Sequence, residues 1–549
     1  MKNKFRFLSL GTLALATTLS LFPGHGKAAQ ALADTPPDVV INTKSLSKLP
    51  RDIVKIPVLK DLLTEDFVTY YQHGGADWLS IRGALVRLAY ENSSDLPTQL
   101  LAWVFSSPAE VALWKSPNGK LNRFLLVMDQ TGVKALMELF AKVATADKQL
   151  SKESSATTRA EVYSIQYGEN RELYFAAEGG RLFIFSDLGM KLPDNAEARG
   201  IADRAKSFFG LNDDISVFGP KLSGQDHVIT ARMDYLSFGY QAFFSALRAI
   251  RFDARGGSWT TAVLTEGGAN AMAEADWAVQ PRGAAFCFGV PVNVEAVQSV
   301  LGTPTTAPWL KASATKATAC WHADSKFYAP LITVQGDFGG LIGKADELQP
   351  VFDKLIGARE AYWKLSNAES DTEPVSATLA WSKKLPVAVV KTGTATTFVR
   401  EVGGRQGLYP AKDSKQAALL TSSRFFRVKL AVTARALIFS PDDKLVDRAL
   451  STIDGKFPSM AASLATSEKG PSAIFSPAGF AKLAKQTVMD SLPASDESEF
   501  RAAASRHLFP NLDAMAKAPT QTAALDLGKQ SGSKLPVWKP LKWTTHATR

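Results

Sequence analysis

The spacing of apolar residues constrains the fold of this chain more than any other feature, because helical and strand-like segments alternate. Apolar residues recur at helical spacing over 133–143, 348–356 and 445–453, so each segment presents one apolar face. Short runs typical of strands lie between them, such as 100–105, 111–114, 124–128, 162–167, 173–177 and 182–186. Several consecutive strands between single helices predict an α+β fold with mainly antiparallel sheets.

Two similar heptapeptides indicate an internal repeat. Residues 181–187 (RLFIFSD) and 435–441 (RALIFSP) share Arg, Ile, Phe and Ser in register. Each precedes a segment with an acidic start and helical character, although coincidence between two sheet-edge hairpins explains the same similarity. We therefore predict two related halves built from repeated strand–helix–strands–helix units. We divide the chain after residue 33 into an N-terminal α+β unit (34–218), a central α+β region (219–370) and a C-terminal α+β unit (371–549).

The N-terminus has the composition of a secretory signal peptide. Three basic residues within the first six precede an apolar run over 8–22, and small residues around Ala28 and Ala33 offer two cleavage sites. The apolar run is shorter than the roughly 17–25 residues of a membrane-spanning helix. We therefore expect residues 1–33 to be removed and the mature chain to be a soluble periplasmic protein.

The charge of the mature chain argues against a nucleic-acid partner. The segment 1–33 holds four basic residues and no acid, so its removal lowers the formal net charge from +10 to +6. Lysine and arginine do not cluster with aromatic residues into a basic patch, which is the usual footprint of nucleic-acid binding. The hydrophobic fraction of 46% is ordinary for a globular protein, so the chain is long enough and apolar enough to bury a substantial core.

The only cysteines of the chain are Cys287 and Cys320. In an exported protein, one pair is most simply a disulfide. A metal site is the alternative, because Cys320, His322 and Asp324 alternate and would share one face of a strand. Cys287 would then complete a tetrahedral ligand set. We predict the disulfide, since such alternation is frequent by chance and thiolate sites are fragile outside the cytoplasm.

Three short motifs occur in the order used by penicillin-binding enzymes. They are an S-x-x-K at Ser45, an S-x-N at Ser116 and a K-T-G at Lys391. In that chemistry Ser45 would be acylated, Lys48 would take its proton and Lys391 would hold a substrate carboxylate. Two prolines soon after Ser45 interrupt the helix that the nucleophile requires, and the sequence around Ser116 is typical of a turn. We therefore interpret the motifs as two turns and a strand end, and keep an acyl-transfer enzyme as the alternative function.

The histidines and the C-terminal tail give weaker signals. His227 follows Asp226, but adjacent residues of a strand point to opposite faces, so they form a poor acid–base pair. Trp538 and Trp543 stand beside lysines in the tail, which fits a membrane-surface or partner-docking element. We predict instead a closing strand that packs its aromatic rings. No fingerprint of a nucleotide or other cofactor site is present, so we expect no cofactor.

The beginning of the mature chain resembles a known family. Residues 36–52 (PPDVVINTKSLSKLPRD), followed by 62–67 (LLTEDF), are similar to a proteobacterial family of exported proteins defined only as a domain of unknown function. This resemblance implies an envelope protein that is an accessory to a bacterial alpha-2-macroglobulin homologue, a periplasmic protease trap. It implies no catalytic residues. We therefore expect a non-catalytic binding or accessory protein, with the acyl-transfer enzyme and a ligand or metal carrier as alternatives.

Overall fold

The computed structural model describes the residues that form its helices and strands together with several turns. These are residues 37–46, 48–49, 52, 107–114, 123–129, 133–145, 150–153, 161–167, 171–178, 181–186, 222–232, 247–265, 277–291, 316–325, 329–353, 355, 388–391, 394–403, 425–464, 472–491, 504–525 and 537–545. The segment 1–33, the predicted strand 100–105, the helical segment after residue 187 and Ser116 lie outside them.

Ten strands form an N-terminal array. They are β1 (Val39–Thr43), β2 (Ala109–Trp114), β3 (Arg123–Asp129), β4 (Leu150–Glu153), β5 (Val162–Tyr167), β6 (Arg171–Glu178), β7 (Arg181–Phe185), β8 (His227–Arg232), β9 (Leu247–Arg255) and β10 (Ser258–Thr265). Antiparallel pairings arrange them as β4-β5-β6-β7-β3-β2-β1-β8-β9-β10. Helix α6 (Val133–Ala144) follows β3.

Ten further strands form a C-terminal array. They are β11 (Ala284–Pro291), β12 (Lys316–His322), β13 (Leu331–Gln335), β14 (Ala388–Lys391), β15 (Ala395–Gly403), β16 (Phe425–Thr433), β17 (Ala436–Ser440), β18 (Ala473–Phe475), β19 (Gln521–Leu525) and β20 (Val537–Thr545). Their order is β14-β15-β16-β17-β13-β12-β11-β18-β19-β20, again antiparallel throughout. A helix over 345–353 follows β13, and α14 (Asp443–Ile453), α15 (Pro477–Ser491) and α17 (Phe509–Met515) follow later strands.

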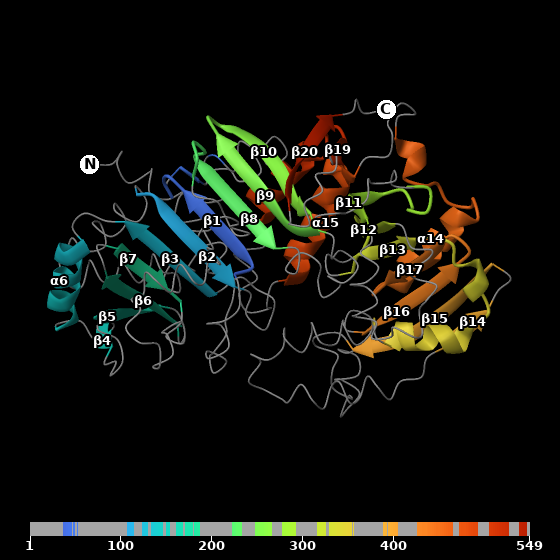
Figure 1. The fold of residues 1–549 in the computed structure, drawn as a ribbon, viewed down its shortest axis with the longest axis horizontal. Helices are drawn as coiled ribbons and strands as arrows, with labels where there is room; N and C mark the ends of the chain where they lie inside the picture. The colour runs from blue at the N-terminus through green and yellow to red at the C-terminus, as the bar shows by residue number, and fades with distance from the viewer. Residues whose placement is uncertain are drawn as a thin grey trace.

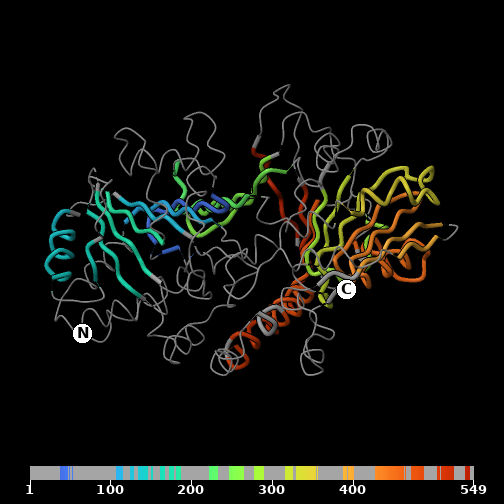
Figure 2. The backbone as a smooth tube through the Cα atoms, turned by 90° about the horizontal axis from the view of Figure 1, so that it is seen from below, coloured from blue at the N-terminus to red at the C-terminus, as the bar shows by residue number. Residues whose placement is uncertain are grey.

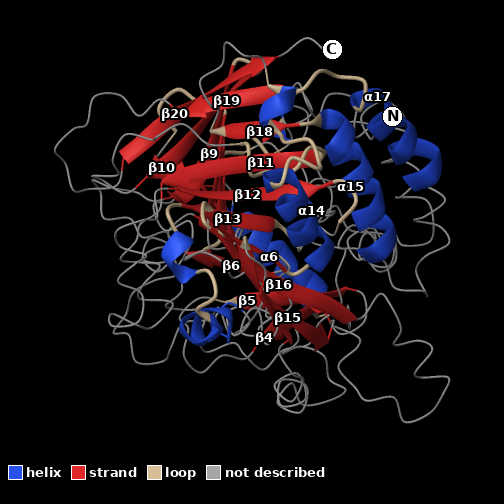
Figure 3. Ribbon diagram, turned by 90° about the vertical axis from the view of Figure 1, so that its right-hand side faces the viewer, coloured by secondary structure: helices blue, strands red, loops and turns tan. Residues whose placement is uncertain are grey.

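The two arrays join into one sheet. Strands β10 and β20 pair antiparallel over five residue pairs, from Thr261 with Leu541 to Thr265 with Val537, and complete a sheet of 20 strands. Figure 1 shows the arrays end to end, with β10 and β20 meeting in the middle, and Figure 2 shows the same arrangement from below. In Figure 3 the strands from β20 to β13 follow one another down the view, beside α14 and α15.

The predicted α+β fold of repeated strand–helix–strands–helix units is wrong. Helical spacing located α6 and α14 correctly, but the described strands all belong to one antiparallel sheet, and few helices accompany it. Periodicity reports only which local face is apolar, whereas the sheet is built by pairings between strands far apart in sequence, such as β10 with β20. The helices therefore cover parts of a continuous sheet and do not divide it into units.

The strands follow the same order in both arrays. Each strand of the first array corresponds to the strand of the second array whose label is higher by ten, so β4 corresponds to β14 and β10 corresponds to β20. Registers agree as well, since Val111 of β2 pairs with Leu126 of β3 and, at the equivalent positions, Thr318 pairs with Thr333. The two similar heptapeptides contribute β7 and β17, which are equivalent strands. One array ends at residue 265 and the next begins at 284, both inside the region 219–370 that we expected to be one central unit.

Each array has its own apolar core beneath an equivalent helix. In the first array, the ring of Phe140 on α6 packs against Phe175 and Tyr163, with ring centroids 4.8 Å and 5.7 Å away. In the second array, Phe352 of the helix over 345–353 packs against Phe398 of β15 at 5.7 Å. Burying such aromatic side chains supplies much of the stability of a sheet–helix layer. Among the described residues, no helix is long and apolar enough to cross a membrane.

Candidate functional site

Ser45, the predicted alternative nucleophile, lies in a buried turn directly after β1. Its backbone N–H donates to Thr43 Oγ1 at 3.0 Å, and its carbonyl accepts the N–H of Lys48 at 3.2 Å and of Leu49 at 3.3 Å. Ser45 is only 7% exposed, whereas Lys48 is exposed. The turn therefore does not present a serine and a lysine together to a substrate.

Lys391 lies far from Ser45. It ends β14, the outer strand of the C-terminal array, while Ser45 follows β1 of the N-terminal array, and the pairings place twelve strands between β1 and β14. At about 4.8 Å per strand, this amounts to ~60 Å along the sheet. Figure 1 shows β1 and β14 in opposite halves of the molecule. The residues of the penicillin-binding-like set that the structure describes do not converge.

The most connected polar group near Ser45 is His227, the first residue of β8. Its Nδ1 lies 2.7 Å from Thr43 Oγ1, and its Nε2 lies 2.8 Å from Asp52 Oδ2. Trp259 stacks near the imidazole with ring centroids 6.4 Å apart, and its indole N–H donates to the carbonyl oxygen of Asp52 at 2.6 Å. These contacts hold the turn that contains Ser45 against β8 and β10.

A hydroxyl, an imidazole and a carboxylate in a row are the components of a nucleophilic triad. Whether the row can act on a substrate depends on the exposure of the Thr43 hydroxyl. Thr43 and His227 are each 1% exposed, and Thr43 Oγ1 already accepts the N–H of Ser45 and lies 2.9 Å from its carbonyl oxygen. No substrate carbonyl can reach this hydroxyl without opening the turn. The row is therefore a structural lock between residues 43–52 and β8.

Sequence reasoning missed the partner of His227. Asp52 lies 175 residues away from it, and no spacing rule connects the two. Asp226, the neighbour in sequence, instead accepts the N–H of Gly256 at 2.8 Å and binds Lys44 at 3.2 Å. The hydrogen bond from Gly256 and the contact with Lys44 lower the pKa of Asp226. Asp226 and His227 thus serve different partners.

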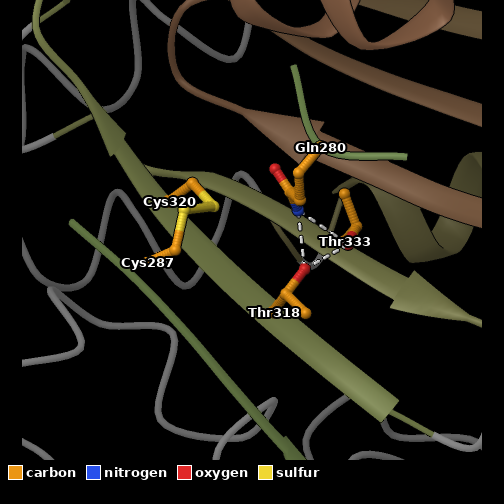
Figure 4. The surroundings of a disulfide bond; sticks show 5 residues. All are labelled: Gln280, Cys287, Thr318, Cys320 and Thr333. Carbon is orange, nitrogen blue, oxygen red and sulfur yellow. Dashed lines mark hydrogen bonds between the residues drawn. A yellow bond between two sulfur atoms is a disulfide. The ribbon is translucent and has the colours of Figure 1, made fainter. Parts of the chain in front are cut away.

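Cys287 and Cys320 form a disulfide across β11 and β12, where they are directly opposed (Figure 4). Both are fully buried. The disulfide uses the two thiolates that the alternative metal site would need. Among the described residues, no group of three His, Cys, Asp or Glu side chains fits a metal ion.

His322 lies two residues beyond Cys320 and is fully buried. Neither ring nitrogen has a hydrogen-bond partner in the described part of the structure. Burial, together with the positive charge of Arg448, lowers the pKa of His322 to about 4, so the ring is neutral at pH 7. Asp324, the third residue of the alternating set, binds Arg448 through both carboxylate oxygens.

A second buried polar cluster lies beside the disulfide. The amide nitrogen of Gln280 donates to Thr318 Oγ1 at 2.6 Å and to Thr333 Oγ1 at 3.0 Å (Figure 4). These groups connect the segment before β11 to β12 and β13. Val111 and Leu126 occupy the equivalent positions of the N-terminal array, so the polar cluster distinguishes the second array from the first. None of its three side chains titrates, so we interpret the cluster as a structural contact and not as a reactive site.

Comparison with known proteins gives a family. The model of the family described as "Uncharacterized protein conserved in bacteria (DUF2138)" matches residues 7–543. The chain belongs to this family. It is also 33% identical over 529 residues to the Escherichia coli (strain K12) protein described as "Uncharacterized protein YfaA", which covers 92% of this chain and 89% of the relative. No solved structure matches.

The descriptions of this family and of its relative name no function, so functional information comes from the arrangement of side chains in the structure. The residues that sequence analysis selected fall into three separate places: the turn at Ser45, the outer strand with Lys391 and the disulfide region with His322. The structure brings together Cys287 and Cys320 as predicted, and it adds Asp52 as the partner of His227. Each described cluster binds one part of the sheet to another.

Proposed function

We propose that this protein is an exported, non-catalytic binding protein of the bacterial envelope that acts as an accessory to a protein partner. The proposal rests on one observation: the side chains that could carry out chemistry either form structural contacts or lie far apart. Thr43, His227 and Asp52 lock a buried turn, and Ser45 and Lys391 lie at distant strands of one sheet. A sheet of 20 strands stabilised in this way offers long surfaces for a macromolecular partner and a poor framework for a compact active site.

Export is supported by the N-terminal segment and by the disulfide. Residues 1–33 have the basic start, apolar run and small-residue cleavage sites of a signal peptide. A fully buried disulfide between the only two cysteines of the chain fits a periplasmic location, since disulfides persist in oxidising compartments. In this proposal, the mature protein begins after Ala28 or Ala33.

The resemblance of the chain's opening residues supplies the first partner to examine. It implies an alpha-2-macroglobulin-like protease trap in the same compartment, and the protein would then hold or position this trap. Partner binding would use exposed surface of the sheet or helices, so changes at the buried lock around His227 should affect binding only when they unfold the protein.

Export is tested by fractionation of cells that produce the chain with a C-terminal tag. We expect a shortened protein in the periplasmic fraction, and a chain without residues 2–33 should remain in the cytoplasm at full length. N-terminal sequencing of the periplasmic protein distinguishes cleavage after Ala28 from cleavage after Ala33. An unprocessed protein in the cytoplasm would contradict the proposal.

Binding is tested by reversible cross-linking in intact cells, followed by purification of the tagged protein and mass spectrometry. We expect one envelope protein at near-stoichiometric yield, and the alpha-2-macroglobulin homologue should be captured directly when both proteins are purified and mixed. A signal-peptide fusion of an unrelated periplasmic protein is the control. Recovery of no specific partner would count against the proposal.

The enzymatic alternative has a separate test. Fluorescent penicillin should not label the purified protein, and Ser45→Ala should leave the background signal unchanged. Labelling that disappears in Ser45→Ala would establish acyl transfer and overturn the non-catalytic assignment.

A further inference from the structure

The outer strand β14 exposes two adjacent large apolar side chains. Three large hydrophobic residues are exposed among the described residues, namely Val389 (40%), Val390 (53%) and Trp543 (40%). Two of the three are adjacent on β14, and all four residues of this strand are exposed. In the described part of the chain β14 pairs with β15 alone, so one edge of the strand has no partner strand. An exposed apolar edge strand is a template for pairing with another strand.

The equivalent edge of the N-terminal array shows how this fold closes an edge. Strand β4 pairs with β5 over four residues in the register that β14 adopts with β15, which makes Ser151 equivalent to Val389 and Lys152 equivalent to Val390. Lys152 forms an ion pair with Glu161, and the hydrogen bond from Lys152 is the main cause that lowers the pKa of Glu161. Charged and polar side chains on an edge strand oppose edge-to-edge association. One outer edge of the sheet is therefore protected, and the other is apolar.

We propose that β14 pairs antiparallel with β14 of a second copy of this chain, across a twofold axis. The strand is self-complementary in this arrangement. The axis is normal to the joined sheet, so a residue and its copy lie on the same face, and Val389 stands opposite the partner subunit's Val389. Val390 then stands opposite the partner subunit's Ala388. No like charges face each other, and valine pairs favour strand association. Isologous pairing of one surface with itself is the usual basis of a homodimer.

The joint between the two arrays is a precedent within the same molecule. Strands β10 and β20 are equivalent outer strands of the two arrays, and they pair antiparallel edge to edge. An association of two β14 strands repeats that joint at the opposite end of the second array (Figure 1). Since β4 is protected by Ser151 and Lys152, the sheet of described strands has one apolar outer edge, and the assembly closes as a dimer instead of growing into a filament.

The short length of β14 limits the expected affinity of the dimer. Four residues bury less than the roughly 1,200–2,000 Å² of a stable interface, so we expect a dissociation constant in the micromolar range or weaker. Sedimentation velocity of the purified mature protein over a range of concentrations should show a reversible change from monomer to dimer. The Val389→Lys/Val390→Lys variant should remain a monomer at every concentration, with an unchanged circular dichroism spectrum.

A matched change at the other edge tests the closure. Ser151→Val/Lys152→Val gives β4 the apolar character of β14, and we expect species larger than a dimer. A wild-type protein that stays monomeric at all concentrations would overturn the proposal. So would a dimer that Val389→Lys/Val390→Lys leaves intact, or larger species already present in the wild type.

The register is tested by cross-linking, which remains informative if the double lysine variant fails to fold. Oxidation of the Val389→Cys protein should give disulfide-linked dimers, because residue 389 and its copy are directly opposed at the twofold axis. The Val390→Cys protein should not, because residue 390 and its copy are offset by two positions along the strands, which exceeds the Cα separation of about 7 Å that a disulfide spans. The native cysteines are both in the Cys287–Cys320 disulfide, so the new bond is identified by peptide mapping. Equal cross-linking of each variant alone would contradict the register and the proposal.

Discussion

Trp114 of β2 and Trp321 of β12 occupy the same register position of the two ten-strand arrays. Both are buried, at 2% and 6% exposure. The residues before them differ: Leu113 in the first array corresponds to Cys320 in the second, which carries the disulfide. The arrays thus keep a common aromatic position and differ in how neighbouring strands are held together.

His322 should make the protein less stable in acid. Its pKa is lowered by burial to about 4 from an ordinary value of 6.5, so between these pH values the unfolded state binds a proton that the folded state does not. Stability is therefore complete above pH 6.5 and falls as the pH decreases towards 4, by about 3 kcal/mol for this shift.

His322→Leu should remove this component. At pH 7 we expect stability equal to the wild type or higher by about 1 kcal/mol, because a buried imidazole that has no hydrogen-bond partner among the described residues is replaced by an apolar side chain. Urea unfolding between pH 7 and pH 4 measures the free energy of unfolding of both proteins. Carboxylates titrate in both, so their contribution cancels in the difference. Parallel stability curves for the two proteins would contradict the prediction.

The lock around His227 should contribute measurably to stability. Thr43→Val keeps the side-chain volume but leaves the N–H of Ser45 and one nitrogen of His227 without their partner, so we expect a loss of about 1–3 kcal/mol. A double-mutant cycle with His227→Ala should show a coupling of about 0.5–3 kcal/mol in urea unfolding.

Lys44→Ala is the control for that lock. It removes an exposed ion pair with Asp226 one residue away from Thr43, and exposed pairs contribute little. A loss for Lys44→Ala as large as that for Thr43→Val would indicate a general sensitivity of the turn and not the specific hydrogen bonds.

The disulfide should stabilise the C-terminal array. It links residues 33 positions apart, for which the chain-entropy model gives about 3–4 kcal/mol. We expect this loss in the Cys287→Ala/Cys320→Ala variant, measured by urea unfolding. Iodoacetamide should modify the unfolded wild-type protein only after reduction, and alkylation without reductant would show that the thiols are free.

Helix α15 should tolerate no side chain at Gly479. A Cβ atom there would lie 2.8 Å from the Cα of Ala285 and 3.1 Å from the carbonyl oxygen of Ala284, both on β11. We expect Gly479→Ala to lower the melting temperature, with a cost of about 1–3 kcal/mol for the displaced backbone. Gly340→Ala is the matched control, because nothing lies within 4 Å of its added Cβ, and its melting temperature should be nearly unchanged.

Local elements could be predicted from the sequence because their signals are local. Helical spacing located α6, and alternation of strand-like residues located β2, β3 and β5 to β7. The tail that holds Trp538 also forms a strand, but it lies at the centre of the sheet, where the ring of Trp538 packs under the guanidinium of Arg251 at 4.6 Å. The tail sequence does not indicate its partner, since pairing with β10 depends on residues almost three hundred positions earlier.

The site was harder to predict for the same reason. Cys287 and Cys320 could be paired because the chain has no other cysteines, so composition alone leaves one intramolecular choice. Asp52 could not be assigned to His227, because the sequence contains 53 acidic residues and no spacing rule selects one of them as the partner of that imidazole. Only the antiparallel registers that bring the turn after β1 alongside β8 determine the contact.

The position of β20 makes assembly of the sheet depend on a segment synthesised late. This strand pairs with β10 on one side and with β19 on the other. A chain interrupted before Val537 would therefore leave one edge of each of those two strands unpaired. Proteases that cleave unpaired strands would then remove a chain that lacks residues 537–545 and leave a chain that contains them. Pairing of β20 with both neighbours therefore makes closure of the sheet dependent on residues 537–545.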